Sequence, residues 1–291
     1  MQQKNELLIY TIETIIDKGN ARASNLTMMH VYKLLYLAYL SLKKQNINIK
    51  LPYSWYLYGT MVESHSFTCQ TGVALGGYFL EDNRAVNFYC LSSKITLSSS
   101  TQYTIEQTID TLLDTYEINN ELNLDNLLKD VYAIAPTEFQ RIYKYELMKN
   151  NLNDTNHTNL LSTLDSLTKS FPHEKYDDIF SRYLRWEELI RLAIELKENK
   201  TDIKDLINIY WNYFAAVLRS RENENLTEEE IQQLKTFAEK KETEYDLLTF
   251  DYEEKYTLQL PPVDITDLPE EGQELLKDIS TIAYNACTSE R

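Results

Sequence analysis

The sequence predicts a mainly helical protein with a small α+β part at its N-terminal end. Only 6 Gly and 6 Pro occur among 291 residues, whereas sheet-rich proteins need both residue types for their many tight turns. After residue 100 apolar residues recur at helical spacing almost throughout, while the β-rich segments fall within the first hundred residues. We therefore expect a winged-helix-like module over 1–100 and a helical domain over 101–291, with a sub-boundary at 150–159.

Two helices and a strand open the chain. Apolar spacing predicts a helix over 5–17, which Gly19 would end, and a second over 25–44. The second is apolar nearly all round, as is typical of a central core helix. After a proline, alternating aromatic residues predict a strand over 53–58.

A short helix and a hairpin complete the first hundred residues. Residues 61–70 fit the helix, and two β-rich runs, 78–80 and 85–91, are joined by four polar residues. This arrangement is typical of a hairpin. Helices followed by a hairpin form the order of elements found in a winged helix.

The remaining chain is predicted to be helical. Thr104 and Gln107 have the spacing of a capping box before one helix, and Thr227 and Glu230 have it before another that runs to about residue 246. The other expected helices cover 124–134, a segment that starts at Pro136, 176–198, 203–220 and 270–286. The helix over 203–220 is apolar enough to be the central helix of this half.

The charge is unevenly distributed. The net charge is −16, yet residues 1–100 carry nine basic and six acidic residues, a balance of +3, which leaves −19 for the remainder. An acidic C-terminal half keeps a protein soluble, and it can also steer a basic partner. Non-specific binding of nucleic acid by the whole chain is not expected, because it requires clustered cations.

The cysteines and the N-terminus indicate a cytoplasmic protein. Cys69, Cys90 and Cys287 are odd in number and widely spaced, which does not indicate a disulfide framework. The first 17 residues contain three acids and lack the basic start of a signal peptide. The longest apolar run, 31–42, is interrupted by Lys33 and is too short to span a bilayer. We expect no membrane insertion.

Motifs of catalysis and cofactor binding are absent from the sequence. It has no phosphate-binding glycine loop, no GxSxG, no HExxH and no CxxC. Acid pairs such as Glu13/Asp17 and Asp110/Asp114 are expected by chance among 45 acidic residues, and we interpret them as solvated faces. We therefore expect no catalytic residue and no cofactor.

His65 and Cys69 are the best candidates for metal ligands. They are four residues apart and would share a helix face, with Cys90 as a third ligand. Zinc needs four ligands, or three and a water molecule, and no convincing fourth is evident. A Cys69–His65 nucleophile pair also lacks a third group to orient the histidine. We expect no metal.

A set of basic and tyrosine residues forms the candidate contact site. Its members flank the second helix or follow it: Arg22, Lys43, Lys44, Lys50, Tyr56 and Tyr58. Such a set suits a partner protein or the phosphates of a nucleic acid. The structural alternative is that Lys43 and Lys44 complement the C-terminus of a helix while the tyrosines belong to the core.

The stretch "VYKLLYLAYLSLKK", residues 31–44, is followed by "SWYLYGTMV", residues 54–62. Together they resemble the N-terminal signature of the Panacea-domain (SocA-like) family, a K-L-L-Y-x-A helix and then an aromatic strand that ends in Y-G-P-V. The matching residues are Lys33, Leu34, Leu35, Tyr36, Ala38, Trp55, Tyr58, Gly59 and Val62. Thr60 and Met61 depart from the pattern, where the family usually has a proline.

The resemblance covers about residues 5–90 and implies a partner-binding module. In this family such modules are often the antitoxin or chaperone-like half of toxin–antitoxin and phage-defence systems, and they offer no catalytic residue to transfer. The residues themselves indicate a core in which the tyrosine stripe packs and Trp55 fastens the strand to the helix.

We therefore expect a non-enzymatic protein that acts by protein–protein interaction, as an antitoxin-like or phage-defence-associated regulator. One alternative is a transcriptional regulator that binds DNA through a winged helix in residues 1–100. A second is an enzyme with an unrecognised acidic site. The sequence leaves the partner and the oligomeric state open.

Overall fold

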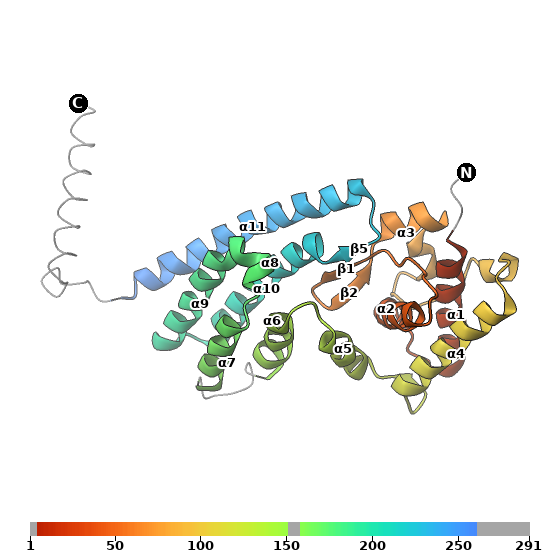
Figure 1. The fold of residues 1–291 in the computed structure, drawn as a ribbon. Coiled ribbons are helices and arrows are strands. Elements are labelled where there is room, and N and C mark those ends of the chain that lie inside the picture. The colour runs from red at the N-terminus through yellow and green to blue at the C-terminus, as the bar shows by residue number, and fades with distance from the viewer. Residues whose placement is uncertain (1–4, 151–157, 261–291) are drawn as a thin grey trace, which may run out of the picture. The chain divides into compact units, whose positions relative to one another are not determined.

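The computed structural model describes residues 5–150 and 158–260 (Figure 1). Its elements are mainly helices, with a small antiparallel sheet, so the predicted fold class is confirmed at this level. The chain divides into two compact units, residues 1–250 and 251–291, and of the second only the end of the last helix and the three residues after it are described. Among the described residues, no helix has the length and apolar character needed to cross a bilayer.

The helical elements up to residue 150 are α1 (Glu6–Arg22), α2 (Met28–Lys44), α3 (Ser64–Thr71), η1 (Leu75–Tyr78), η2 (Leu91–Lys94), α4 (Ser99–Tyr116), α5 (Leu124–Ala133), α6 (Glu138–Arg141) and the π-helix η3 (Ile142–Asn150). Those that follow are α7 (Thr158–Lys169), α8 (His173–Tyr176), η5 (Asp177–Ile179), α9 (Phe180–Glu195), α10 (Lys200–Arg221) and α11 (Glu228–Thr257). The strands are β1 (Tyr53–Tyr56), β2 (Gly59–Val62), β3 (Glu117–Ile118), β4 (Glu121–Leu122) and β5 (Asn223–Glu224).

The main sheet has the order β2-β1-β5 and lies between α10 and the helices α2 and α3 (Figure 1). β1 and β2 form a hairpin in which Tyr56 pairs with Gly59, so the connecting turn is Leu57-Tyr58. β5 comes from the far end of α10 and pairs with Tyr53 and Ser54. The sheet therefore joins segments that lie far apart in the chain.

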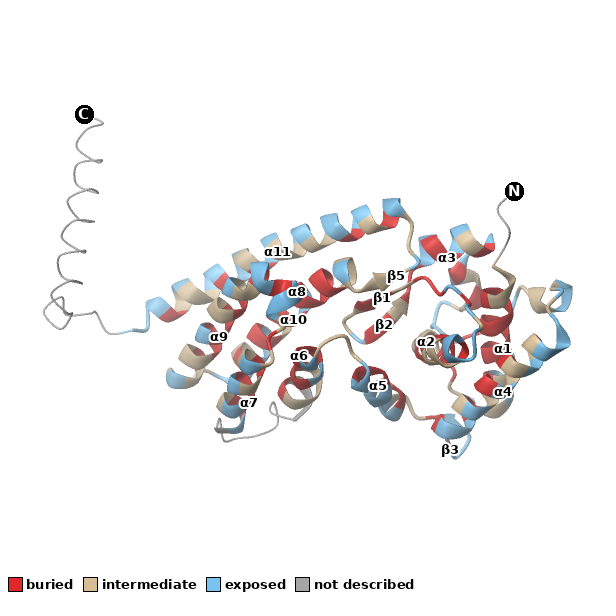
Figure 2. Ribbon diagram, in the orientation of Figure 1, coloured by how far each residue is buried: buried red, intermediate tan, exposed pale blue. Residues whose placement is uncertain are grey.

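α2 is the central helix of the N-terminal part. It contacts α1, α4, α5 and β2, and most of its side chains are buried (Figure 2). On its strand side, the ring of Tyr36 lies 4.9 Å from that of Tyr53 and 5.9 Å from that of Trp55, centroid to centroid. These contacts fix the hairpin against the helix.

α10 is the corresponding helix of the second half, as its apolar sequence predicts. It packs on α9 and on β1. Around it lies a cluster of aromatic side chains: Phe139, Tyr143, Tyr183, Trp186, Tyr210, Trp211 and Phe214. One polar atom of this cluster, Trp186 Nε1, donates a hydrogen bond to the Leu206 backbone carbonyl at 2.8 Å.

The predicted hairpin over 78–91 is much shorter in the structure: residues 78–80 meet 84–86 through backbone hydrogen bonds from Val86 to Tyr78 and from Leu80 to Arg84, but no strand forms. Two short 3₁₀ segments flank this region, and only isolated bridges remain, Phe79 with Ala85 and Thr27 with Arg84. The far end of this region is held by a buried acid. The carboxylate of Glu13 accepts hydrogen bonds from the backbone N–H groups of Leu91 at 2.9 Å and Ser92 at 2.6 Å. These donors therefore do not enter a strand ladder, and Glu13 does not lie on a solvated face.

Two helix boundaries also differ from the prediction. Gly19 lies inside α1 rather than after it, because the glycine allows close packing: a Cβ at this position would lie 2.9 Å from Leu26 Cδ2. Thr104 lies inside α4, which is capped by Ser98, whose side chain accepts from the N–H of Thr101 at 3.2 Å.

The predicted strand over 53–58 ends two residues early, and a second strand, β2, includes the first two residues of the helix expected over 61–70, which begins at Ser64 instead. α11 runs to Thr257, beyond the predicted end. The helix expected over 270–286 lies outside the described residues, as does most of the segment 150–159. The boundary near residue 100 stays a prediction.

Candidate functional site

The turn of the β1–β2 hairpin is held by two side chains from distant parts of the chain. The Leu57 carbonyl accepts a hydrogen bond from the Tyr132 hydroxyl at 3.0 Å and another from Trp211 Nε1 at 3.2 Å. The next residue, Tyr58, is 53% exposed. The turn therefore presents an aromatic side chain on a backbone that α5 and α10 hold in place.

Gly59 follows Tyr58 and is required by both conformation and space. Its φ is +86°, which L-residues with a Cβ rarely adopt. A Cβ here would lie 3.1 Å from Val131 Cγ1 and 3.6 Å from the amine of Lys33. The Tyr-Gly pair of the sequence thus brings the hairpin backbone close to a buried lysine.

Lys33 is the most deeply buried cationic side chain of the site. It is 1% exposed, and its amine donates to the carbonyl of Thr60 on β2. Burial lowers the pKa of Lys33 to about 7, and the charge of Lys144 lowers it further in the same direction. Near neutral pH this amine is therefore only partly protonated.

A pocket of about 440 Å³ lies over Lys33. Its lining comes from α2, from the hairpin and from the loop before η2: Thr27, Met28, Met29, Tyr32, Lys33, Tyr56, Tyr58, Gly59, Met61, Asp82 and Asn83. Three methionines and three tyrosines make the walls largely apolar, and flexible methionines allow a surface to adapt to its ligand.

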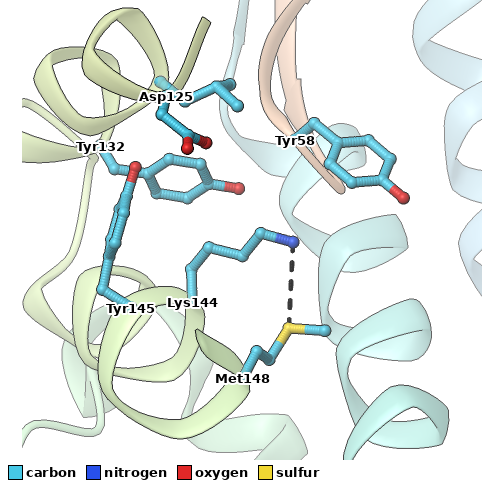
Figure 3. Close-up of a pocket in the computed structure, with 7 residues that line it drawn as sticks. Tyr58, Asp125, Tyr132, Lys144, Tyr145 and Met148 are labelled. Carbon is cyan, nitrogen blue, oxygen red and sulfur yellow. Dashed lines mark hydrogen bonds between the residues drawn. The ribbon is translucent and has the colours of Figure 1, made fainter. Parts of the chain in front are cut away.

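A second pocket, of about 330 Å³, lies on the other side of Tyr58 around Lys144 (Figure 3). Lys144 extends from η3 toward Tyr58, and its amine lies 4.7 Å from the centre of that ring and 5.7 Å from that of Trp211. Met148 Sδ is 3.9 Å from the amine. Burial lowers the pKa of Lys144 to about 8. π-helical turns such as η3 occur often at functional sites.

The two amines have neighbours unlike those of the other buried cations. In the described part of the chain, neither has a carboxylate within ion-pairing distance, and their neighbours are a carbonyl, aromatic rings and a thioether. Two cations that are not neutralised, beside apolar pockets, suit an anionic group on an apolar ligand.

The structure distributes the predicted contact residues over separate places. Arg22 is paired with Asp110 at 2.6 Å and also with Asp114, and Lys43 lies 3.3 Å from Glu224. The acids Asp110 and Asp114 thus neutralise basic side chains of α1.

The other predicted contact residues split into two groups. Lys44 and Lys50 are exposed and lie outside both pockets. Tyr56 and Tyr58 are the two that come together, at the hairpin turn. The ring of Tyr56 stacks on the guanidinium of Arg219 at 5.1 Å.

The residues that carry the Panacea-domain resemblance are mostly interior. Leu34, Leu35, Tyr36 and Ala38 are buried on α2, and Trp55, 2% exposed, packs edge-on to Tyr36. Lys33 and Gly59 meet at the hairpin, as described above. The signature therefore builds the contact between α2 and the hairpin, and its lysine opens into the pocket.

The histidine and cysteine candidates lie elsewhere. Cys69 Sγ is 3.6 Å from His65 Nε2 on exposed α3, and Thr227 Oγ1 is 3.5 Å from His65 Nδ1, a third group that the sequence did not reveal. Cys90 is a free, exposed thiol before η2. Within residues 5–150 and 158–260, no group of three or more His, Cys, Asp or Glu side chains is arranged to hold a metal ion. Cys287 lies outside these ranges.

Lys144 is the residue of the candidate site that the sequence analysis missed. The sequence pattern around a lysine that stands between two tyrosines does not tell whether the lysine is buried or exposed to solvent. One signal was available: its neighbours at i−4 and i+4 are Gln140 and Met148, so no ion pair along the helix could satisfy it.

Comparison with known proteins gives no match, whether to a protein-family model, a curated protein or a solved structure.

Proposed function

We propose that the protein is a non-enzymatic binding protein that neutralises or regulates a partner protein, in the manner of an antitoxin or a phage-defence regulator of the cytoplasm. The resemblance to the Panacea-domain family motivates the biological role. The observation that supports binding is the Tyr58 turn, with a pocket and a lysine on each side, Lys33 buried and Lys144 half-buried.

The geometry of this turn suits recognition of a protein. Energetically dominant interface residues are often tyrosines, tryptophans and arginines at the centre of a contact, and little binding energy is lost when they are already ordered. Tyr58 is exposed, yet its backbone is fixed through the Leu57 carbonyl by Tyr132 and Trp211. The acidic remainder of the chain, −19 after residue 100, favours a partner with a basic surface.

The test compares two exposed tyrosines. The tagged full-length protein captures partners from a lysate of its native host, and Tyr58→Ala is compared with Tyr103→Ala on α4, where Tyr103 is 65% exposed. We expect a specific partner to be lost at least tenfold in Tyr58→Ala and retained in Tyr103→Ala, with both variants folded by circular dichroism. If both variants captured the partner equally well, the Tyr58 turn would not be part of the binding surface.

The winged-helix arrangement and DNA binding through residues 1–100 stay predictions with a separate test. Arg22 and Lys43 already pair with acids, which leaves Lys44 and Lys50 as candidate phosphate contacts. Retention of duplex DNA by the full chain at physiological salt, lost in the double variant Lys44→Glu and Lys50→Glu, would favour a DNA-binding regulator.

A further inference from the structure

The amine of Lys144 lacks the oxygen partners that an ammonium group normally has. It carries three N–H donors, but in the described residues its close neighbours are the ring faces of Tyr58 and Trp211 and the sulfur of Met148. Cation–π contacts stabilise such a charge only in part. Donor capacity therefore remains for a ligand that enters the pocket.

The walls of this pocket determine what the ligand carries besides its charge. Leu128, Tyr132, Tyr145 and Met148 line the pocket, and its space of about 330 Å³ is large enough for one apolar side chain together with a charged group. Asp125 lies on the α5 side of the same pocket (Figure 3). An anion with more than one charge would be repelled by this carboxylate, while a single carboxylate beside Lys144 is tolerated.

The net charge of the whole chain further limits which anionic group can enter this pocket. At −16, the protein repels an acidic partner at long range, so an acidic surface is a poor match. A basic or neutral protein still has one carboxylate at its C-terminus, next to its last side chain. An Asp or Glu residue, by contrast, carries its carboxylate on the side chain itself, so it has no apolar side chain of its own to place against these walls.

We propose that the Lys144 pocket binds the C-terminal carboxylate of the partner chain, with the last, apolar side chain against Leu128 and Met148. This inference rests on the proposed function and names the part of the partner that is recognised. Lys33, on the other side of Gly59, adds a second positive potential, and Tyr58 covers the bound chain end.

Binding of such a carboxylate depends on pH in a defined direction. The charged ammonium form of Lys144 is the one that binds, and its pKa is about 8, so affinity falls as pH rises from 7 to 10. The other titratable groups that face the amine are Asp125, Tyr58, Tyr132 and Tyr145, together with Lys33 beyond Gly59. Burial raises the pKa of Tyr145 to about 12, outside this range.

The experiment uses minimal mimics of a chain end on the full-length protein. N-acetyl-leucine carries the terminal carboxylate, N-acetyl-leucinamide lacks it, and N-acetyl-aspartic acid α-amide carries an acidic side chain instead. Binding is measured by ligand-observed NMR titration. We expect the leucine acid to bind at least about tenfold more tightly than either amide at pH 7, and its affinity to fall about tenfold per pH unit above 8.

Variants assign the preference to the amine. Lys144→Met should abolish the preference for acid over amide, and Lys144→Arg should keep it, since a cation is retained. Asp125→Asn should strengthen binding of the acid. Lys129→Met, at an exposed lysine of α5 outside the pocket, is the matched control and should behave as the wild type.

Equal affinity for acid and amide, an acid preference that survives in Lys144→Met, or equally tight binding of the aspartate probe would overturn the inference. Partner capture keeps this outcome distinct from failure of the proposed function. If the partner is captured in a Tyr58-dependent way but equally well by Lys144→Met, the carboxylate site is wrong and the binding surface stands.

Discussion

The β1–β2 hairpin contacts buried or half-buried charged side chains at two places, which differ in how the charges are satisfied. Glu63, just after β2, is 3% exposed and forms two hydrogen bonds of 2.8 Å with Arg219, while Ser54 also donates to it. Lys33 and Lys144, near the turn, contact a carbonyl, rings and sulfur. At both places the hairpin meets a later segment of the chain. Only at the first place is the buried charge paired with an opposite charge.

The comparison shows that a buried charge has different consequences with and without a partner of opposite charge. A buried ion pair with its donors and acceptors satisfied adds little net stability, but it becomes very costly when one partner is removed. A buried amine without a carboxylate instead shifts its pKa and remains able to take up an anion. The Glu63–Arg219 pair therefore fixes the hairpin, whereas the two lysines are the side chains that we propose to attract an anionic ligand.

The largest expected effect on stability comes from breaking the ion pair between Glu63 and Arg219. Arg219→Met leaves the Glu63 carboxylate buried without its partner and should lower the free energy of unfolding by about 3–5 kcal/mol, measured by guanidinium chloride unfolding. Arg221→Met is the control two residues along α10, because its partner Asp178 is 61% exposed and the expected loss is about 1 kcal/mol or less. Equal losses would show that the two ion pairs are equivalent.

The next effect concerns the glycine that separates the hairpin from Lys33. Gly59→Ala forces a Cβ into a left-handed conformation and against Val131, and should cost about 1–3 kcal/mol of unfolding free energy. Gly76→Ala in η1, where an added Cβ meets no atom within 4 Å, should change stability much less. A neutral Gly59→Ala variant would mean that the turn can move away from the lysine.

The lowered pKa values of Lys33 and Lys144 should make the stability of the protein depend on pH. The pKa of Lys33 in the folded protein is about 7, below its unfolded value near 10.4. The unfolded state thus binds more protons between these values, and unfolding free energy should rise with pH, by at most about 1.4 kcal/mol per unit for each such group. Lys144 acts in the same sense.

Unfolding measured from pH 7.5 to 9.5 tests this prediction, because buried tyrosines with raised pKa values affect stability only above about pH 10. The slope should be smaller in Lys33→Met and unchanged in Lys129→Met. An unchanged slope in Lys33→Met would show that the amine remains solvated in the folded protein.

The smallest expected effect on stability belongs to Tyr58. Because its side chain is more than half exposed, Tyr58→Ala should change the free energy of unfolding by less than about 0.5 kcal/mol, while it removes partner binding as described above. A loss of several kcal/mol would place Tyr58 among the residues that hold the fold.

Much of the helical framework was predictable from the sequence, because long amphipathic segments need only local periodicity. The predicted 124–134 and 203–220 correspond closely to α5 and α10. The failures come from tertiary contacts. The two residues of β5 form a strand only because β1 lies beside them, and the carboxylate of Glu13 binds the N–H groups of Leu91 and Ser92, where the predicted second strand of the hairpin would end.

The candidate site was half predictable for the same reason. Tyr58, Gly59 and Lys33 belong to one quoted motif, and a lysine that interrupts an apolar helix was already evident. Lys144 joins them from η3, more than 80 positions later, and no local pattern indicates that meeting. Its pocket depends on how α5, η3 and the hairpin pack.

The pairing of β5 with β1 has a consequence for biosynthesis. Translation proceeds at about 5–20 residues per second, and about 170 residues separate Tyr56 from Glu224, so for about 10–30 s the nascent chain has β1 without its neighbour on one side. An unpaired strand edge is a template for pairing with other chains. The N-terminal segment therefore leaves the ribosome with this edge of β1 unpaired, and the three-stranded sheet is complete only when α10 and β5 have been made.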